Sequence, residues 1–269
     1  YKDGNEHKYL ELTDSQLPFS TITTSLSNSQ VLDIPYDYQA GETIKSFPCK
    51  DRQKVGYVRN VKMVVNNNSD LSVQTVLRSS GDLARDMRAN YEHKTNEESK
   101  DALQEQLSRS FKNQVLLNTF KFQGLENLKD TVVQELDFTV KNDVISVGDM
   151  NMFKPVMLDI VATANIFTPE RRYYPFEYSD YENADNYRTI IEVELPAGKN
   201  FEQVPTDVKG GFMYMQYSLV YRKPAPNKLV IERTFNTDRT QRLSPMDFEK
   251  MENFFNQIIT AEQKYISFK

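Results

Sequence analysis

The sequence contains few of the residues that carry disulfide, metal or histidine chemistry. Cys49 is the only cysteine, and His7 and His93 are the only histidines among 269 residues. A single cysteine excludes an internal disulfide and a cysteine-based metal site. Pro48 and Lys50 flank Cys49 in a segment with no predicted helix, so nothing in its sequence context would lower the pKa of the thiol. The pattern favours an incidental cysteine over a catalytic one.

Glycine and proline are also scarce, with 9 and 11 residues, while apolar residues make up 39% of the chain. This composition excludes a disordered or collagen-like chain and indicates a globular protein. The best apolar run, residues 156–162, is interrupted by Asp159 and is far shorter than the ~18 residues of a membrane span. The net charge is -5 and the lysines and arginines are scattered, so we expect no nucleic-acid partner.

The chain length favours two domains, and the hydrophobic pattern divides the chain into three parts. Residues 1–54 include an extended connector that contains Pro18, Pro35 and Pro48. Residues 55–165 and 166–269 each have strand-like alternation. We predict a mainly β fold with a few helices: two antiparallel β-sandwich-like modules, with a helical pair inserted in the first and a terminal helix in the second.

The first module begins with a predicted β-hairpin. Residues 57–65 and 71–77 alternate between apolar and polar side chains, and the stretch 66–70 between them has turn chemistry. Two helices follow, one from Asp82 and one that starts at the capping box Thr95 to Glu98. Strands are predicted again at 132–140 and 144–147.

The second module contains predicted strands at 189–195, 214–221 and 229–235. Its last helix has Ser244 as a predicted N-cap, Pro245 at its first position and an apolar stripe that includes Phe255. A short strand over residues 265–268 should join the edge of a sheet.

The entry to the second module combines cationic and aromatic side chains: Arg171, Arg172, Tyr173 and Tyr174. Such groups can hold a sugar ring or a peptide, because aromatic faces stack on C–H groups while arginines bind hydroxyls and carboxylates. The alternative is an ordinary strand whose aromatic rings fill the core. The aromatic run Phe212 to Tyr221 has the same two interpretations, with Tyr217 and Tyr221 predicted on the face of Met213 and Met215.

Carboxylates at Asp180, Glu182 and Asp185 could serve a glycosidase or bind calcium. Their spacing is not specific, and a solvated loop explains them equally well. Neither the carboxylates nor the two histidines predict a cofactor.

Residues Leu10 to Asp14, followed by Pro18 and Phe19, resemble the end of the papain-like core of bacterial transglutaminase-like proteins. Segments of the second module resemble the C-terminal domain of such proteins from Bacteroidetes: 171–176, 191–198, 204–205 and 248–259. The first module, including 81–88 and 149–155, is more loosely similar to the β-sandwich beside the same core. The resemblance implies that residues 1–54 comprise the tail of that core and the connector, with the catalytic domain upstream of Tyr1.

The family uses a Cys-His-Asp triad, and the resemblance places Glu11 at the position of its aspartate. Glu11 is equally explained as a plain strand residue. Without cysteine and histidine partners, the chain itself should not be an enzyme. We expect accessory modules that position a transglutaminase-like or protease-like domain of the same polypeptide, in the periplasm or cell envelope. The alternatives are a glycan- or peptide-binding module and a free-standing hydrolase that uses carboxylates.

Overall fold

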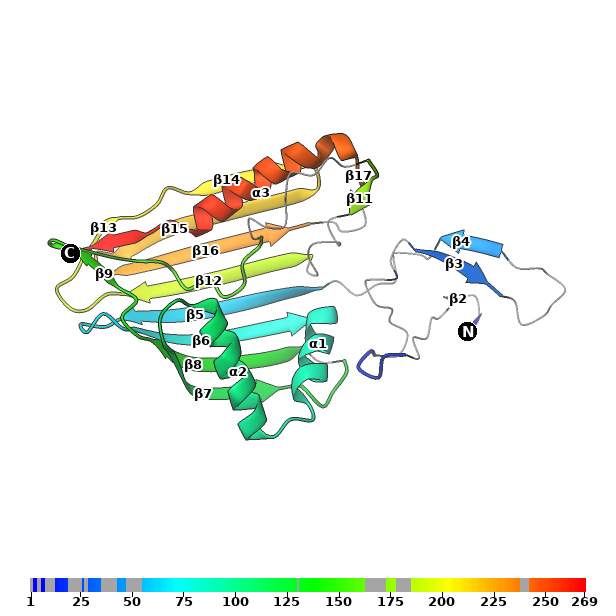
Figure 1. Ribbon diagram of the computed structural model, residues 1–269, viewed down its shortest axis with the longest axis horizontal. Helices are drawn as coiled ribbons and strands as arrows, with labels where there is room; N and C mark the ends of the chain where they lie inside the picture. The colour runs from blue at the N-terminus through cyan, green and yellow to red at the C-terminus, as the bar shows by residue number, and fades with distance from the viewer. Residues whose placement is uncertain are drawn as a thin grey trace.

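The computed structural model describes residues 2–3, 6–7, 13–18, 26, 29–34, 43–46, 55–129, 131–162, 173–177, 185–237 and 242–269. Its main feature is an eight-stranded sheet (Figure 1). The strands, in spatial order, are β14 (Val208–Phe212), β15 (Met215–Ala225), β16 (Lys228–Asn236), β12 (Asn186–Glu194), β5 (Gly56–Val65), β6 (Leu71–Ser80), β8 (Val132–Val140) and β7 (Val115–Gln123).

The central strands have one buried and one accessible face, because successive side chains of a strand point to opposite sides of the sheet. In β5, Tyr57 and Val61 are buried, whereas Val58 and Lys62 between and beside them are exposed. We call the side of Tyr57 the inner face and the side of Val58 the outer face. The alternation that predicts these strands from sequence therefore also predicts the face that packs on the core.

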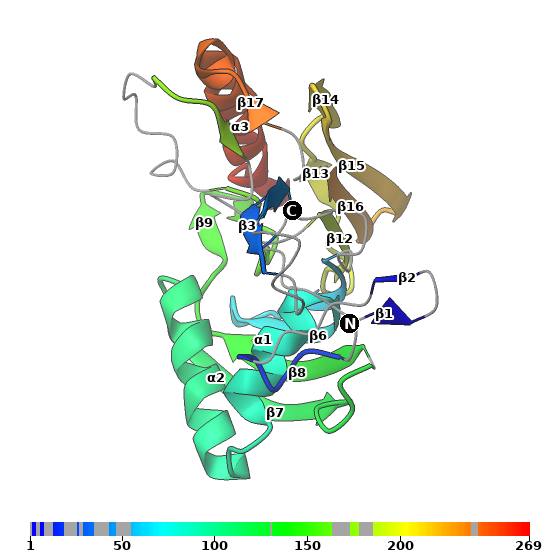
Figure 2. The same ribbon diagram turned by 90° about the vertical axis from the view of Figure 1, so that its right-hand side faces the viewer.

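The inner face is covered by helices, as Figure 2 shows: α1 (Asp82–Tyr91), α2 (Asn96–Ser110) and α3 (Phe248–Glu262) lie on one side of the sheet. A short 3-10 helix, Pro245–Asp247, leads into α3. The rings of Phe255 in α3 and Phe235 in β16 lie 6.0 Å apart, between their centroids. Aromatic contacts of this kind join the helix layer to the sheet.

A smaller, four-stranded sheet contributes to the same hydrophobic core. Its strands, in spatial order, are β13 (Phe201–Gln203), β18 (Ile266–Phe268), β10 (Met150–Phe153) and β9 (Ile145–Val147). Phe153 and Phe268 are buried with their ring centroids 6.1 Å apart. Three two-stranded pairs complete the described elements: β1 (Lys2–Asp3) with β2 (Glu6–His7), β3 (Gln30–Asp33) with β4 (Thr43–Ser46), and β11 (Phe176–Glu177) with β17 (Arg242–Leu243).

The predicted mainly β fold with a few helices is confirmed. The pairing of β12 with β5 differs from the antiparallel prediction, since these two strands are parallel along their whole length. A parallel pair needs a long crossover, which residues 66–185 provide. Strands from both predicted modules, 55–165 and 166–269, therefore lie in one sheet that is continuous through β5 and β12.

The predicted helices agree with the structure. The Thr95 hydroxyl accepts a hydrogen bond from the Glu98 backbone at 3.2 Å, and the Glu98 carboxylate accepts one from the Thr95 backbone at 2.8 Å. Ser244 caps the 3-10 helix and Pro245 is its first residue, so α3 itself starts later, at Phe248. None of the described helices has the length and apolar character needed to cross a membrane.

Candidate functional site

A row of polar residues crosses the inner face of the large sheet over strands β5, β12 and β16. Arg59 in β5, Thr189 in β12 and Arg233 in β16 are cross-strand neighbours. They are 5%, 1% and 0% exposed. Buried arginine side chains require partners, because an unpaired charge in a protein interior is strongly destabilising.

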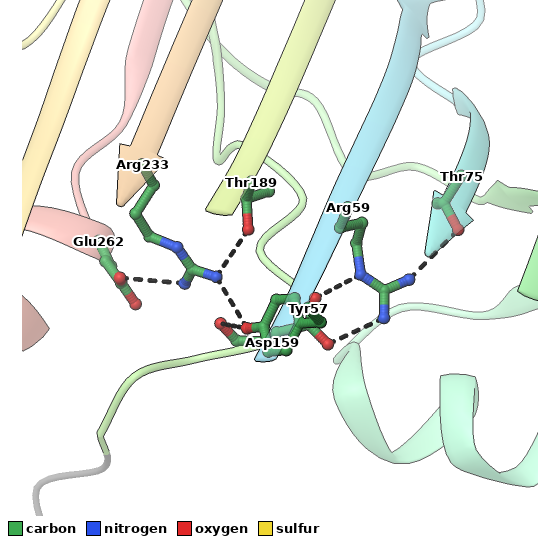
Figure 3. A network of polar contacts seen from close by, with 7 residues as sticks. All are labelled: Tyr57, Arg59, Thr75, Asp159, Thr189, Arg233 and Glu262. Carbon is green, nitrogen blue, oxygen red and sulfur yellow. Dashed lines mark hydrogen bonds and ion pairs between the residues drawn. The ribbon is translucent and has the colours of Figure 1, made fainter. Parts of the chain in front are cut away.

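Arg59 has two partners, which come from the segment after β10 and from β6 (Figure 3). Its Nε and Nη2 atoms donate to the two carboxylate oxygens of Asp159, with the Nη2 bond at 2.8 Å. Its Nη1 atom donates to the Thr75 hydroxyl in β6 at 3.3 Å. A bidentate pair of this kind fixes both position and orientation. Asp159 follows β10 in the chain, so the pair ties the segment after β10 to the sheet.

Arg233 makes the second half of the network. Its Nη1 atom donates to Glu262, the last residue of α3, at 3.1 Å. Its Nη2 atom donates to the Thr189 hydroxyl at 2.8 Å and to the Tyr57 hydroxyl at 3.2 Å. The Tyr57 hydroxyl donates in turn to the Asp159 carbonyl at 3.3 Å, which connects the two halves (Figure 3).

The charges in the network are balanced. Burial alone would lower the pKa of Arg233, but the charge of Glu262, the Tyr57 hydroxyl and Asp159 raise it above the ordinary value. Burial, together with Glu262, raises the pKa of Tyr217, whose hydroxyl donates to Glu262 at 3.2 Å. Arg233 therefore stays charged and Tyr217 stays neutral at physiological pH. The two ion pairs, Arg59 with Asp159 and Arg233 with Glu262, hold the segment after β10 and helix α3 on the sheet. We call this network the clamp.

A second set of polar contacts joins residues 13–18 to α1 and to Glu92, the residue that follows it. The Gln16 side-chain amide donates to the Glu92 carboxylate at 2.7 Å, and the Arg85 Nε atom lies 3.5 Å from an Asp14 carboxylate oxygen. Burial lowers the pKa of Arg85, but the hydrogen bond to Asp86 and the charges of neighbouring carboxylates, Asp14 among them, raise it overall. The segment 13–18 is thus held against α1 by two side-chain contacts.

The structure describes only part of the predicted ligand site. Arg171, Arg172 and Glu11 lie outside the described residues. Tyr173 and Tyr174 are 71% and 82% exposed, so they do not fill the core as the ordinary-strand interpretation expected. In the aromatic run, Tyr217 and Met215 are buried on the inner face. Met213 is 59% exposed and has a φ of 52°, because it lies in the turn between β14 and β15, and so its predicted place on their face was wrong.

The other candidate residues do not form a catalytic group in the described part of the chain. His93 is exposed, with a side-chain accessibility of 85%, and lies 3.9 Å from Glu92. The Asp185 carboxylate accepts a hydrogen bond from the Val55 backbone at 2.8 Å and so anchors the start of β5. Cys49, Asp180 and Glu182 lie outside the described residues. Within the described ranges, no three histidine, cysteine, aspartate or glutamate side chains gather as a metal site.

Sequence reasoning did not identify the clamp. The alternation of residues 57–65 places Arg59 on the apolar face of its strand, and the sequence shows Asp159 only as an interruption of an apolar run. Arg233 occupies the apolar register of β16, between Ile231 and Phe235. One signal in the sequence could have found it. Arg59 and Arg233 each occupy a position whose neighbours two residues away are apolar, and a charge on a buried face needs a buried partner.

Comparisons with known proteins give limited matches. Residues 149–268 match the family model described as "Domain of Unknown Function with solved-structure structure (DUF3858)", which covers less than half of the chain. The match starts at Asp149 and so includes β10, which pairs with β18 near the C-terminus. A search of curated proteins found no match.

One solved structure with partial similarity is a protein from Parabacteroides distasonis described as a "putative protease". The two chains are 12% identical, with a TM-score of 0.34, and the match covers 49% of this chain and 30% of that protein. The chain thus spans less than a third of that protein's length. Neither match tests the transglutaminase-like resemblance, which stays a prediction. What the comparisons establish is that residues 149–268 are similar to DUF3858, a family whose description assigns no activity.

Proposed function

We propose that residues 55–269 form a non-catalytic module that packs beside and positions a transglutaminase-like or protease-like domain of the same polypeptide, in the cell envelope. In this proposal, residues 1–54 comprise the C-terminal end of that domain and a connector to the module. The module contributes a rigid surface, and the catalytic groups belong to the neighbouring domain.

One observation carries this proposal: the segment 13–18 contacts α1 through side chains. Gln16 donates to Glu92, and Asp14 pairs with Arg85. These residues belong to the stretch that resembles the end of the transglutaminase-like core, since Asp14 closes its first part and Gln16 lies just before Pro18. A domain that ends there would be held close to the sheet by the same contacts.

Helix α1, which contacts residues 13–18, is itself fixed to the rest of the fold. Leu83 and Met87 of α1 pack against the hydrophobic core, and Arg88 is buried with its Nε atom donating to the Gly124 carbonyl at 3.3 Å. A helix fixed in this way can define the orientation of what binds to it, whereas a mobile loop could not.

The contact is tested by hydrogen exchange on the intact chain. We expect Arg85→Ala combined with Glu92→Ala to speed amide exchange in residues 13–18, because both side-chain contacts are lost. Arg109→Ala is the matched control, since Arg109 pairs with Glu105 on the exposed side of α2. Unchanged exchange in the double variant would contradict the proposed docking.

The role is tested by sequence and by enzymology. The coding sequence upstream of Tyr1 should contain a cysteine at a helix N-terminus and a histidine on a strand, as the triad requires. The purified chain should incorporate no amine into glutamine-containing peptides and should cleave none. Turnover by this chain alone, or an upstream region without those residues, would refute the proposal.

A second candidate function is glycan or peptide binding at residues 171–174. The exposure of the adjacent rings of Tyr173 and Tyr174 favours it, because exposed aromatic rings are suitable for stacking on sugars. A glycan and peptide array tests this function. We expect Tyr174→Ala to abolish any signal, while Tyr265→Ala, at another exposed ring, should leave it intact. A blank array for the unmodified chain would eliminate this candidate.

A further inference from the structure

The outer face of the large sheet contains a hollow with an unusual set of side chains. It has a volume of roughly 490 Å³ and lies where β5 and β12 begin. All three described helices lie on the opposite side of the sheet (Figure 2). Gly56 lies between Asn186 and Ser80 in the cross-strand register, and a Cβ atom at this position would lie only 3.1 Å from the Asn186 carbonyl oxygen, so the two strands approach closely there.

Two arginines flank the floor of the hollow. Arg188 of β12 and Arg78 of β6 are both register partners of Val58 in β5, one on each side. Their Cα atoms are therefore about 10 Å apart, which is two strand spacings. Two long guanidinium side chains at this separation can converge on one anionic group above Val58.

The arginines keep capacity for a ligand. Arg78 forms no ion pair with any described residue. Arg188 donates through Nε and Nη2 to Glu232, at 3.2 and 2.9 Å, which orients its guanidinium and leaves the Nη1 atom without a described partner. None of the described residues that line the hollow is acidic.

A second hollow on the same face provides a contrast. It lies at the other end of the strands, and its charged lining residues have both signs: Lys62, Lys228, Asp137, Glu192 and Glu194. Lys228 and Glu194 are 3.5 Å apart there and balance each other. In the hollow at Arg78 and Arg188, by contrast, Glu232 balances the charge of Arg188, whereas the charge of Arg78 has no acidic partner among the described residues.

The uncharged lining groups indicate the kind of anion. Asn186, Asn236, Thr234 and Ser80 supply amides and hydroxyls, which both donate and accept hydrogen bonds. Sugar hydroxyls have the same dual character. An extended peptide is usually bound at a sheet edge through its backbone, and this hollow lies on a face.

We propose that this hollow binds an acidic sugar. The carboxylate lies between Arg78 and Arg188, the hydroxyls pair with the surrounding amides and hydroxyls, and a C–H face of the ring packs on Val58. This site is separate from the contact between residues 13–18 and α1, and it does not depend on that contact.

Calorimetric titration of the full chain tests the site with four probes: trigalacturonate, its methyl ester, inorganic phosphate and a hexaglutamate peptide. We expect trigalacturonate to bind and the methyl ester to bind at least about tenfold more weakly, because the ester lacks the charge. Equal binding of the ester, no binding of trigalacturonate, or equal or tighter binding of phosphate or hexaglutamate would overturn the assignment.

Substitutions locate the binding on the sheet. Arg78→Met should weaken trigalacturonate binding about tenfold, the loss expected for charge-assisted hydrogen bonds. Lys62→Met is the matched control, since Lys62 is an exposed cation on the same face, near the opposite end of β5, and should change nothing. Thermal unfolding should be the same for both variants, as both side chains are exposed. Full affinity in Arg78→Met would refute the site.

Discussion

The strongest quantitative prediction concerns the buried ion pair between Arg233 and Glu262. Their side chains are 1% and 6% accessible, and the charged atoms are 3.1 Å apart. Arg233→Met retains much of the apolar side-chain volume but leaves the Glu262 carboxylate buried with only the Tyr217 hydroxyl as a described donor. Breaking a buried pair from one side costs about 3–5 kcal/mol of unfolding free energy.

The partner substitution and the double variant complete a thermodynamic cycle. Glu262→Gln leaves Arg233 charged and buried, with Thr189 and Tyr57 as its remaining partners. We expect a loss of about 3 kcal/mol for this variant as well. The double variant removes both charges, so it should lose less than the sum of the two single losses, with a coupling energy of roughly 2 kcal/mol.

Urea unfolding followed by circular dichroism measures each free energy. The matched control is the pair Arg188 and Glu232, on the exposed side of the neighbouring strands β12 and β16, with charged atoms 2.9 Å apart. A pair in solvent contributes only about 0.2–1 kcal/mol. A coupling energy for Arg233 and Glu262 as small as that of the exposed pair would refute the clamp.

Three further predictions concern the elements around the clamp. Phe255→Ala should lower the unfolding free energy by about 3–5 kcal/mol, measured in urea, because Phe255 is fully buried. Thr95→Ala should lower it by about 1 kcal/mol through loss of the capping box, and Thr95→Ser should restore it. Hydrogen bonds from Lys141 and Asn142 lower the pKa of Asp70 below its usual 3.8. Asp70→Asn should therefore be less stable than the unmodified chain at neutral pH, and the difference should disappear as the pH falls through the lowered pKa, as acid titration of both proteins would show.

The sequence predicted those elements whose signals are local. The capping box of α2 depends on Thr95 and Glu98, which are three residues apart. The strict alternation of β5, β6 and β8 appears within ten residues, and the structure buries the predicted side of each. Strand β7 was missed because a bulge near Asn118 breaks its alternation. Strand β14 was missed because Gly210 and Gly211 remove its pattern.

The candidate site could not be predicted in the same way, because its contacts are long-range. Arg59 and Asp159 are 100 residues apart in the chain, and Arg233 and Tyr57 are 176 apart. A charged residue among the apolar positions of a strand indicates that a buried partner exists, but the sequence does not identify that partner. The parallel pairing of β5 with β12 brings these residues together, and no short motif marks that pairing.

The clamp also has a consequence for the extent of the structural unit. Asp159 and Arg233 belong to the segment that matches DUF3858, whereas Arg59 and Tyr57 precede it. Residues 149–268 alone would retain the Asp159 carboxylate without the guanidinium that it binds, and β12 without its neighbour β5. An exposed central strand and an unpaired carboxylate both destabilise a fold. We therefore expect the stable unit to include β5 as well as the matched segment.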